Sequence, residues 1–203
     1  GKIVGVEALL RWHHPERGVL LPGEFIQTAK QLGLLEPIGY WVLNRLCLDI
    51  AKMDEMKIPP LRVSLNVAHD QFMAPNFVST DESILSSMNV NASRFEFELA
   101  ESAVVANLDD IADDMILLEK QGVRFALDGF GTGYSSLPQL QKLPITTLKL
   151  DKSYVQKVTN DPDSASIVRA MIYMAHGLEL TVVGEGVETE EQKTFLVENR
   201  CDH

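Results

Sequence analysis

Cysteine is nearly absent from this sequence: the two that occur, Cys47 and Cys201, lie far apart. Two cysteines cannot build a disulfide framework, so a reduced compartment is favoured. No apolar run approaches the roughly 18 residues that a membrane-spanning helix needs, and the first residues read as a strand rather than as a signal peptide. We therefore expect a cytoplasmic protein, or the cytoplasmic domain of a membrane protein.

Positive charge is also scarce, because 18 Lys and Arg residues stand against 29 Asp and Glu residues and give a formal net charge of −11. Binding of a polyphosphate chain usually needs a basic face, so no DNA or RNA polymer is expected as a partner. A small phosphate ligand is still compatible with this composition. Clustered carboxylates can recruit divalent metal ions, which then supply the positive charge.

What the chain does contain is an alternation of short apolar strands and amphipathic helices. Its length of 203 residues and its 45% hydrophobic content predict one domain with a sizeable core. Predicted strands are Ile3–Leu10, Arg62–Val67, Arg94–Leu99, Val123–Leu127, Thr146–Leu150 and Leu180–Val183. Predicted helices are Glu36–Lys57, Asp109–Lys120, Asp163–Gly177 and Glu190–Asn199. This order indicates an α/β protein with a parallel sheet.

The positions of polar residues favour a barrel over an open sheet. No Gly-x-Gly-x-x-Gly motif follows the first strand, which weakens the dinucleotide-binding alternative. Polar groups instead stand at the carboxyl ends of several strands, where a (β/α)-barrel places its catalytic residues; they are Asn66, Glu98, Asp128, Lys149 and Glu185. Six strands cannot close an eight-stranded barrel. We therefore predict a TIM-like (β/α)8 barrel that lacks its first and last strands.

Several of these polar residues permit both a structural and a functional interpretation. Glu7 in the first strand could form an ion pair with Arg11 or bind a metal, because a buried glutamate needs a partner. Asn66 could be a buried hydrogen-bonded amide or a hard oxygen ligand. Glu96 and Glu98 alternate with phenylalanines and share one face of their strand. Lys149, inside an apolar strand, could form a structural salt bridge or act in catalysis.

The segment Asp128-Gly129-Phe130-Gly131-Thr132-Gly133 carries the most information. Glycine is needed where φ is positive or where the backbone approaches a ligand, although a plain turn is the alternative. A calcium loop does not fit, because the spaced acidic ligands are absent. Glu185 and Glu188, beside Gly184 and Gly186, could serve the site or cap a helix. Purely structural roles at every strand end together are improbable, so we favour a metal-dependent or acid/base site.

In this order and at this spacing, the residues resemble the EAL domain family of cyclic di-GMP phosphodiesterases over essentially all of residues 1–203. The segment from Glu7 to Trp12 is similar to the family signature, and Leu21-Pro22 with Glu24-Phe25-Ile26 to the segment that follows it. The Glu185-Gly186-Val187-Glu188 segment also resembles the family pattern. Gly131 to Leu137 resembles the loop that the family uses to hold the second metal and to join subunits.

The resemblance implies a function and a set of roles. The expected reaction is hydrolysis of cyclic di-GMP to linear pGpG with two Mg²⁺ or Mn²⁺ ions, in a bacterial signalling and biofilm context. The expected metal ligands are Glu7, Asn66, Glu98, Asp128 and Glu185, and the catalytic residues Lys149, Glu185 and Glu7. Arg11, Leu10 and Asp151 would bind substrate, and Glu101, Glu188, Gly131 and Gly133 would support the loop. A homodimer linked to a GGDEF or sensor domain is expected.

The chain also departs from the family pattern. Gly129 stands where the family usually has a second aspartate that contributes to the second metal, Ala100 where it has Thr, and Lys30 where it has Glu. These departures leave a cyclic di-GMP receptor with little or no turnover as the alternative to an active enzyme, and a protein-binding scaffold as the least favoured one. Because the family barrel has a further strand at each end, we expect one module of a longer multidomain signalling protein.

Overall fold

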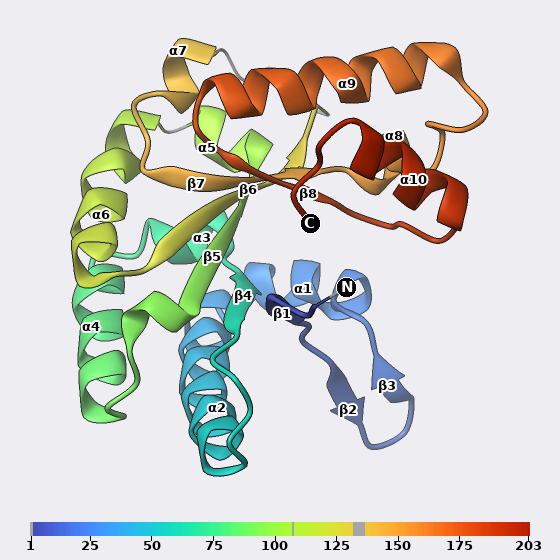
Figure 1. The fold of residues 1–203 in the computed structure, drawn as a ribbon. Helices are drawn as coiled ribbons and strands as arrows, with labels where there is room; N and C mark the ends of the chain where they lie inside the picture. Colours follow the sequence, from blue (N-terminus) through green and yellow to red (C-terminus); the bar gives the residue numbers. More distant parts are fainter. Residues whose placement is uncertain (1, 107, 132–136) are drawn as a thin grey trace. The chain divides into compact units, whose positions relative to one another are not determined.

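The computed structural model describes residues 2–106, 108–131 and 137–203 (Figure 1). The chain forms two compact units, which are considered separately below. The first unit comprises Gly1–Phe97 and Leu117–Val123, and the second comprises Glu98–Ile116 and Arg124–His203. Strand β5 (Phe95–Ala100) and helix α6 (Leu108–Gln121) contribute residues to both units. Within the described ranges, no helix combines the length and the apolar character needed to cross a membrane.

In the first unit, two parallel strands are joined by a hairpin and two helices. Strands β1 (Gly5–Ala8) and β4 (Arg62–Asn66) pair with Glu7 opposite Ser64. Between them lie the antiparallel strands β2 (Trp12–His14) and β3 (Gly18–Leu20), followed by α1 (Pro22–Gln31) and α2 (Leu35–Glu55). After β4 come α3 (His69–Phe72), α4 (Phe77–Ser87) and the 3-10 helix η1 (Ala92–Arg94), which leads into β5 beside β4.

In the second unit, the sheet order is β5, β6, β7, β8. Its strands are β6 (Arg124–Phe130), β7 (Ile145–Leu150) and β8 (Thr181–Gly184), and β7 runs parallel to both of its neighbours β6 and β8. Its other helices are α5 (Glu101–Ala106), α7 (Leu137–Leu140), α8 (Lys152–Val155), α9 (Pro162–Gly177) and α10 (Glu190–Glu198). Helix α9 packs against α8 and β8 (Figure 1).

The predicted α/β class with parallel strands is confirmed, since all six predicted strands form. The predicted first strand, Ile3–Leu10, was too long, because β1 ends at Ala8. Trp12 belongs to a hairpin that the sequence did not predict, and its ring packs edge-on against Phe25, with 5.6 Å between ring centroids. By contrast, β6 is longer at its carboxyl end than predicted, because it extends to Phe130 rather than ending at Leu127.

Local signals define the ends of several helices. Asp161 caps α9 by accepting a hydrogen bond from the Asp163 amide at 3.1 Å, as its Asp-Pro-Asp sequence predicted. The opposite ends are less favourable, because α2, α4, α9 and α10 are each followed by a non-glycine residue in the left-handed region. These residues are Lys57, Asn89, Glu179 and Arg200, with φ between 52° and 63°.

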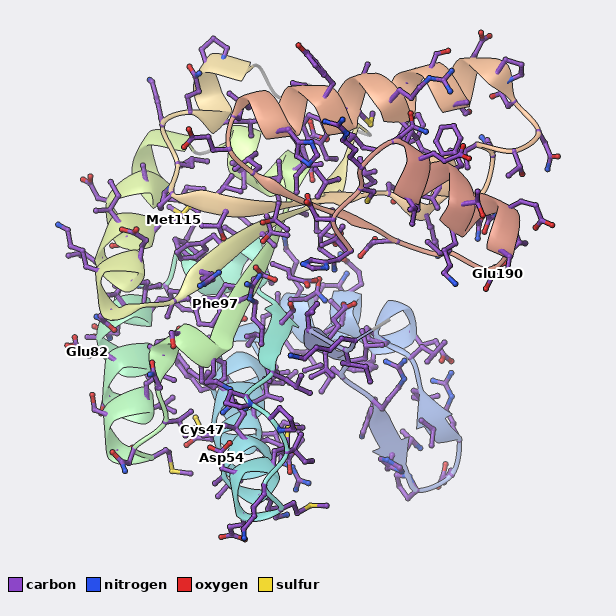
Figure 2. The ribbon with its side chains drawn as sticks, in the orientation of Figure 1. Cys47, Asp54, Glu82, Phe97, Met115 and Glu190 are labelled. Carbon is purple, nitrogen blue, oxygen red and sulfur yellow. The ribbon has the colours of Figure 1, made fainter. Side chains whose placement is uncertain are left out.

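The first unit also buries an acid between helices. Asp81, on α4, is 2% exposed, and burial raises the pKa of its carboxyl to about 7. The neighbouring helix α2 places two neutral groups near it, Tyr40 and Cys47. Cys47, labelled in Figure 2, is fully buried, and burial raises the pKa of its thiol to about 11. An ionised Asp81 is therefore poorly solvated by its surroundings.

We predict that Asp81→Asn stabilises the protein at pH 8 but much less at pH 5. Between about pH 4 and pH 7 the folded state holds a proton on Asp81 that the unfolded state releases, so stability falls as pH rises through this window. The gain at pH 8 should be on the order of 2 kcal/mol. Urea unfolding at both pH values measures it. Glu82→Gln, on the same helix but exposed (Figure 2), is the control. Equal gains at the two pH values would contradict the prediction.

Candidate functional site

In the first unit, Glu7 and Asn66 meet across the β1–β4 pair. Asn66 is the last residue of β4, and its Nδ2 donates a hydrogen bond of 2.9 Å to Oε1 of Glu7. Side chains two residues apart share a face of a strand, so Asn66 lies on the same face as Ser64, the register partner of Glu7. Both side chains are exposed. A carboxylate and an amide oxygen thus stand together as hard donors suited to a divalent cation.

On that same face, Glu96 is held by two side chains of β4. Its carboxylate is 5% exposed and accepts hydrogen bonds from Arg62 Nη1 at 3.0 Å and from Ser64 Oγ at 3.1 Å. An ion pair and a hydrogen bond at Glu96 therefore join β5 to β4. For this glutamate, the structural interpretation holds.

In the second unit, Lys149 on β7 forms ion pairs with two carboxylates. Its Nζ lies 2.6 Å from Oε2 of Glu98 on β5 and 2.7 Å from Oε1 of Glu185, which follows β8. Lys149 and Glu98 are buried, 6% and 2% exposed, whereas the Glu185 side chain keeps 26% exposure. Three strands that are separate in sequence thus converge on one ammonium group. Sequence reasoning predicted all three residues, and the structure brings them into direct contact.

This contact sets the charge state of Lys149. Burial alone would lower its pKa, but hydrogen bonds to Glu185 and Glu98, together with their charges, outweigh burial and raise the pKa above its ordinary value. Lys149 is therefore an ammonium ion that can donate hydrogen bonds to a phosphate oxygen or a water molecule. It is not a free base in this arrangement. The two carboxylates provide oxygen atoms of the kind that Mg²⁺ and Mn²⁺ prefer.

The β6 end that carries Asp128 is irregular. Asp128 and Gly129 are half-buried, and the pairing with β7 shifts register between Leu127 and Phe130. Gly129 has a φ of +68°, in the left-handed region that favours glycine. The glycine that departs from the family pattern thus occupies a backbone conformation in which most side chains are strained.

Two residues further on, Gly131 is held on both sides. Its amide donates to Oε2 of Glu101 at 3.0 Å, and its carbonyl accepts from the Tyr154 hydroxyl at 2.8 Å. Glu101, the first residue of α5, is 3% exposed. The structure therefore brings Glu101 and Gly131 together, as two residues expected to support the loop. Gly133, and the rest of the loop through residue 136, lie outside the described residues.

Two further predicted residues flank α8. Asp151 caps this helix by accepting from the Ser153 amide at 2.7 Å, and hydrogen bonds from Ser153 lower the pKa of its carboxyl. Glu188 accepts from Nε2 of Gln156 at 3.2 Å. The capping role of the Glu185–Glu188 segment falls instead to Thr189, which forms a capping box with Gln192 at the start of α10.

The remaining predicted residues, Leu10 and Arg11, line a groove in the first unit. The groove has a volume of about 780 Å³ and is largely apolar, with Trp12, Phe25 and Trp41 also on its walls. Arg11 is exposed, and its Nη1 donates to the Leu10 carbonyl at 2.7 Å. Trp12 belongs to the segment that resembles the family signature, whereas the sequence analysis assigned no site role to Trp41, which lies on helix α2.

Taken by itself, neither unit gathers three or more described His, Cys, Asp or Glu side chains that could hold a metal ion. The donor chemistry nevertheless fits a hard divalent cation, because the predicted ligands offer carboxylate and amide oxygens alone. Lys30, another departure from the family pattern, pairs with Asp70 at 2.9 Å. Both side chains are exposed, so this pair contributes little to stability.

Comparisons with known proteins give a consistent result. The chain is 40% identical over 201 residues to an uncharacterized signaling protein of Caulobacter vibrioides, covering 99% of the chain and 24% of that relative. It is 38% identical over 200 residues to the cyclic di-GMP phosphodiesterase PdeR of Escherichia coli, covering 98% of the chain and 30% of that protein.

A solved structure, the PaMucR phosphodiesterase in complex with c-di-GMP, matches with a TM-score of 0.95 and 35% identity. The match covers 99% of this chain and 81% of that one. The family model described as EAL domain matches residues 1–203. The chain belongs to the EAL domain family.

Proposed function

We propose that the chain is a cyclic di-GMP phosphodiesterase domain that hydrolyses its substrate to linear pGpG. The observation that carries this proposal is the cluster of Lys149, Glu98 and Glu185, formed at the ends of three strands in a chain of the EAL family, in which Lys149 and Glu98 are buried. A buried lysine between two carboxylates at strand ends is more typical of a site than of a core. The relatives named as phosphodiesterases support the same reaction.

The proposed metal ligands are Glu7, Asn66, Glu98, Asp128 and Glu185. When bound, two Mg²⁺ or Mn²⁺ ions would lower the pKa of a water molecule and stabilise charge on the phosphate oxygens. The hydrogen bond between Asn66 and Glu7 supports this assignment, because it already orients a carboxylate and an amide toward each other. Because Glu98 and Glu185 also form ion pairs with Lys149, their carboxylates would already be oriented when a metal ion binds.

The remaining steps belong to charged side chains of the chain itself. Lys149 would donate a hydrogen bond to the attacking water or to a phosphate oxygen, and Glu7 and Glu185 would receive protons or orient that water. Arg11 would bind a phosphate oxygen with its guanidinium group. Leu10, on the wall of the apolar groove, and Asp151, at the start of α8, would contact the rest of the nucleotide.

A receptor that binds cyclic di-GMP without turnover is the second candidate, and one observation favours it. Gly129 replaces a carboxylate that the family usually supplies, and its φ of +68° means that the backbone beside Asp128 is shaped for glycine. Loss of one ligand would weaken the second metal site more than the first. Nucleotide binding would survive this loss, whereas activation of water would suffer.

We further propose that the chain is one module of a longer cytoplasmic signalling protein, with a GGDEF or sensor domain linked to it, and that it forms homodimers. The chain spans 24% to 32% of the curated relatives it matches first, which supports the modular arrangement. One of these longer relatives, MucR of Pseudomonas aeruginosa, is named as a bifunctional diguanylate cyclase and cyclic di-GMP phosphodiesterase.

The deciding experiment incubates the protein with cyclic di-GMP and either Mn²⁺ or Ca²⁺. We expect calorimetric binding with both ions and formation of linear pGpG with Mn²⁺, because Ca²⁺ has looser geometry and should support binding with little hydrolysis. Binding without product would favour the receptor. Absence of binding with either ion, and no competition with labelled nucleotide, would refute both candidates.

Glu7→Ala should abolish turnover while leaving the fold intact. The Glu7 side chain is exposed, so its removal should change the free energy of unfolding by less than about 1 kcal/mol. Loss of a metal ligand should lower kcat by at least about 100-fold. Glu16→Ala, which removes another exposed glutamate in the turn between β2 and β3, is the control. A Glu7→Ala protein that hydrolyses cyclic di-GMP at the parent rate would show that the site is wrongly assigned.

Gly129→Asp should raise the rate and lower the Mn²⁺ concentration for half-maximal activity about 10-fold, because it restores a carboxylate beside Asp128. The new side chain must adopt the left-handed conformation, which costs about 1 kcal/mol but is tolerated better by Asp and Asn than by most residues. Gly129→Asn is the matched control, since it carries the same strain and shape without the charge. Steady-state kinetics across a Mn²⁺ series would contradict the prediction if the two variants behaved alike.

A further inference from the structure

Helix α8 connects the segments that follow the two strands on either side of β7. It begins directly after β7, where Asp151 caps it, and it contains Lys152 to Val155. Its Tyr154 hydroxyl donates a 2.8 Å hydrogen bond to the carbonyl of Gly131, just beyond β6. Gln156, directly after the helix, donates to Glu188, beyond β8. One short helix therefore fixes the chain beyond both strands.

The contact at Gly131 depends on packing as well as on the hydrogen bond. Gly131 has a φ of +97°, and a β-carbon at this position would lie 2.2 Å from the Met171 methyl carbon and 3.2 Å from the Tyr154 ring. The ring and Met171, on α9, therefore press against the glycine backbone. Because Glu101 holds the amide of the same residue, both polar backbone groups of Gly131 are satisfied by side chains from two different helices.

The contact between α8 and the segment after β8 also depends on a glycine, Gly186. Gly186 has a φ of +66°, and a β-carbon there would lie 2.7 Å from Cβ of Lys152. Gln192, in the capping box of α10, also donates to the Gln156 carbonyl at 3.5 Å. Glycine thus allows the segment after β8 to approach α8 closely, as Gly131 does for the segment after β6.

We propose that Tyr154 is a positioning residue: by binding Gly131 it holds the end of β6, and with it Asp128 and Gly129, against the helix that follows Lys149. The positional part of this inference rests on the proposed function, in which Asp128 is a metal ligand. Gly131 lies three residues beyond Asp128, and the irregular pairing of β6 between Leu127 and Phe130 leaves that end less constrained by the sheet. A side-chain anchor at Gly131 compensates for this weakened pairing.

Tyr154→Phe tests the proposal, because it deletes the hydroxyl and keeps the ring that packs on Gly131. Tyr173→Phe is the matched control, since Tyr173 lies on α9 and is 84% exposed. Two quantities are measured: hydrogen exchange of the peptide spanning residues 124–131, and the dissociation constant for Mn²⁺ alone, by titration without nucleotide. For Tyr154→Phe we expect about five-fold faster exchange and about five-fold weaker Mn²⁺ binding, the effect of one neutral hydrogen bond. Neither quantity should change in Tyr173→Phe.

Each result bears on the proposal. Faster exchange with weaker Mn²⁺ binding supports it, and a fall in kcat with an unchanged KM adds to that support. Faster exchange with unchanged Mn²⁺ affinity would show that the hydroxyl is only a local structural bond, and unchanged exchange would show that it does not hold β6; either overturns the proposal. If the unsubstituted protein itself binds no Mn²⁺, the proposed function fails and the positional role fails with it, whatever the exchange rates show.

Discussion

An ammonium group inside an apolar strand has to be matched by charge, and the second unit is organised around that requirement. Lys149, near the carboxyl end of β7, is only 6% exposed, and an isolated buried charge there would be strongly destabilising. Glu98 and Glu185 supply the match from β5 and from the end of β8. Because Glu98 lies in β5 and Glu185 directly follows β8, these strands must keep their places in the sheet for the charges to balance. The same electrostatic demand that specifies the fold also concentrates reactive groups at one point.

The glutamates of β5 show how neighbouring positions on one strand acquire different roles. Glu96 accepts hydrogen bonds from Arg62 and Ser64, so its negative charge is balanced within the β4–β5 pair. Glu98, two residues further on, is committed to Lys149. Glu7 and Asn66 differ again, since they are exposed and contact each other. Structural pairing thus lies toward the start of β4 and β5, and the residues with candidate chemistry lie toward their carboxyl ends, which is the usual division in barrel folds.

The strands and the candidate site residues could be predicted from the sequence because their signals are local. A lysine within Leu148-Lys149-Leu150, or an aspartate before Gly129, contradicts its apolar surroundings and so predicts a special environment. Three features had no such signal. Trp12 of the β2–β3 hairpin packs on Phe25, the role of Glu96 depends on which strand lies beside it, and Tyr154 binds a glycine 23 residues away. Contacts between distant segments decide these, and a single sequence does not encode them as a pattern.

Four helices are followed by non-glycine residues in the left-handed conformation, which L-amino acids rarely adopt. This has a consequence for mutational tolerance. Lys57, Asn89, Glu179 and Arg200 all hold left-handed conformations where glycine is the relaxed choice. Replacing such a residue by glycine would relieve this strain at a helix end, away from Lys149 and its carboxylates. The stability gained could offset the destabilisation that new side chains near a reactive centre usually bring. Directed evolution of nucleotide specificity could draw on these helix ends first and only then alter the residues that contact the ligand.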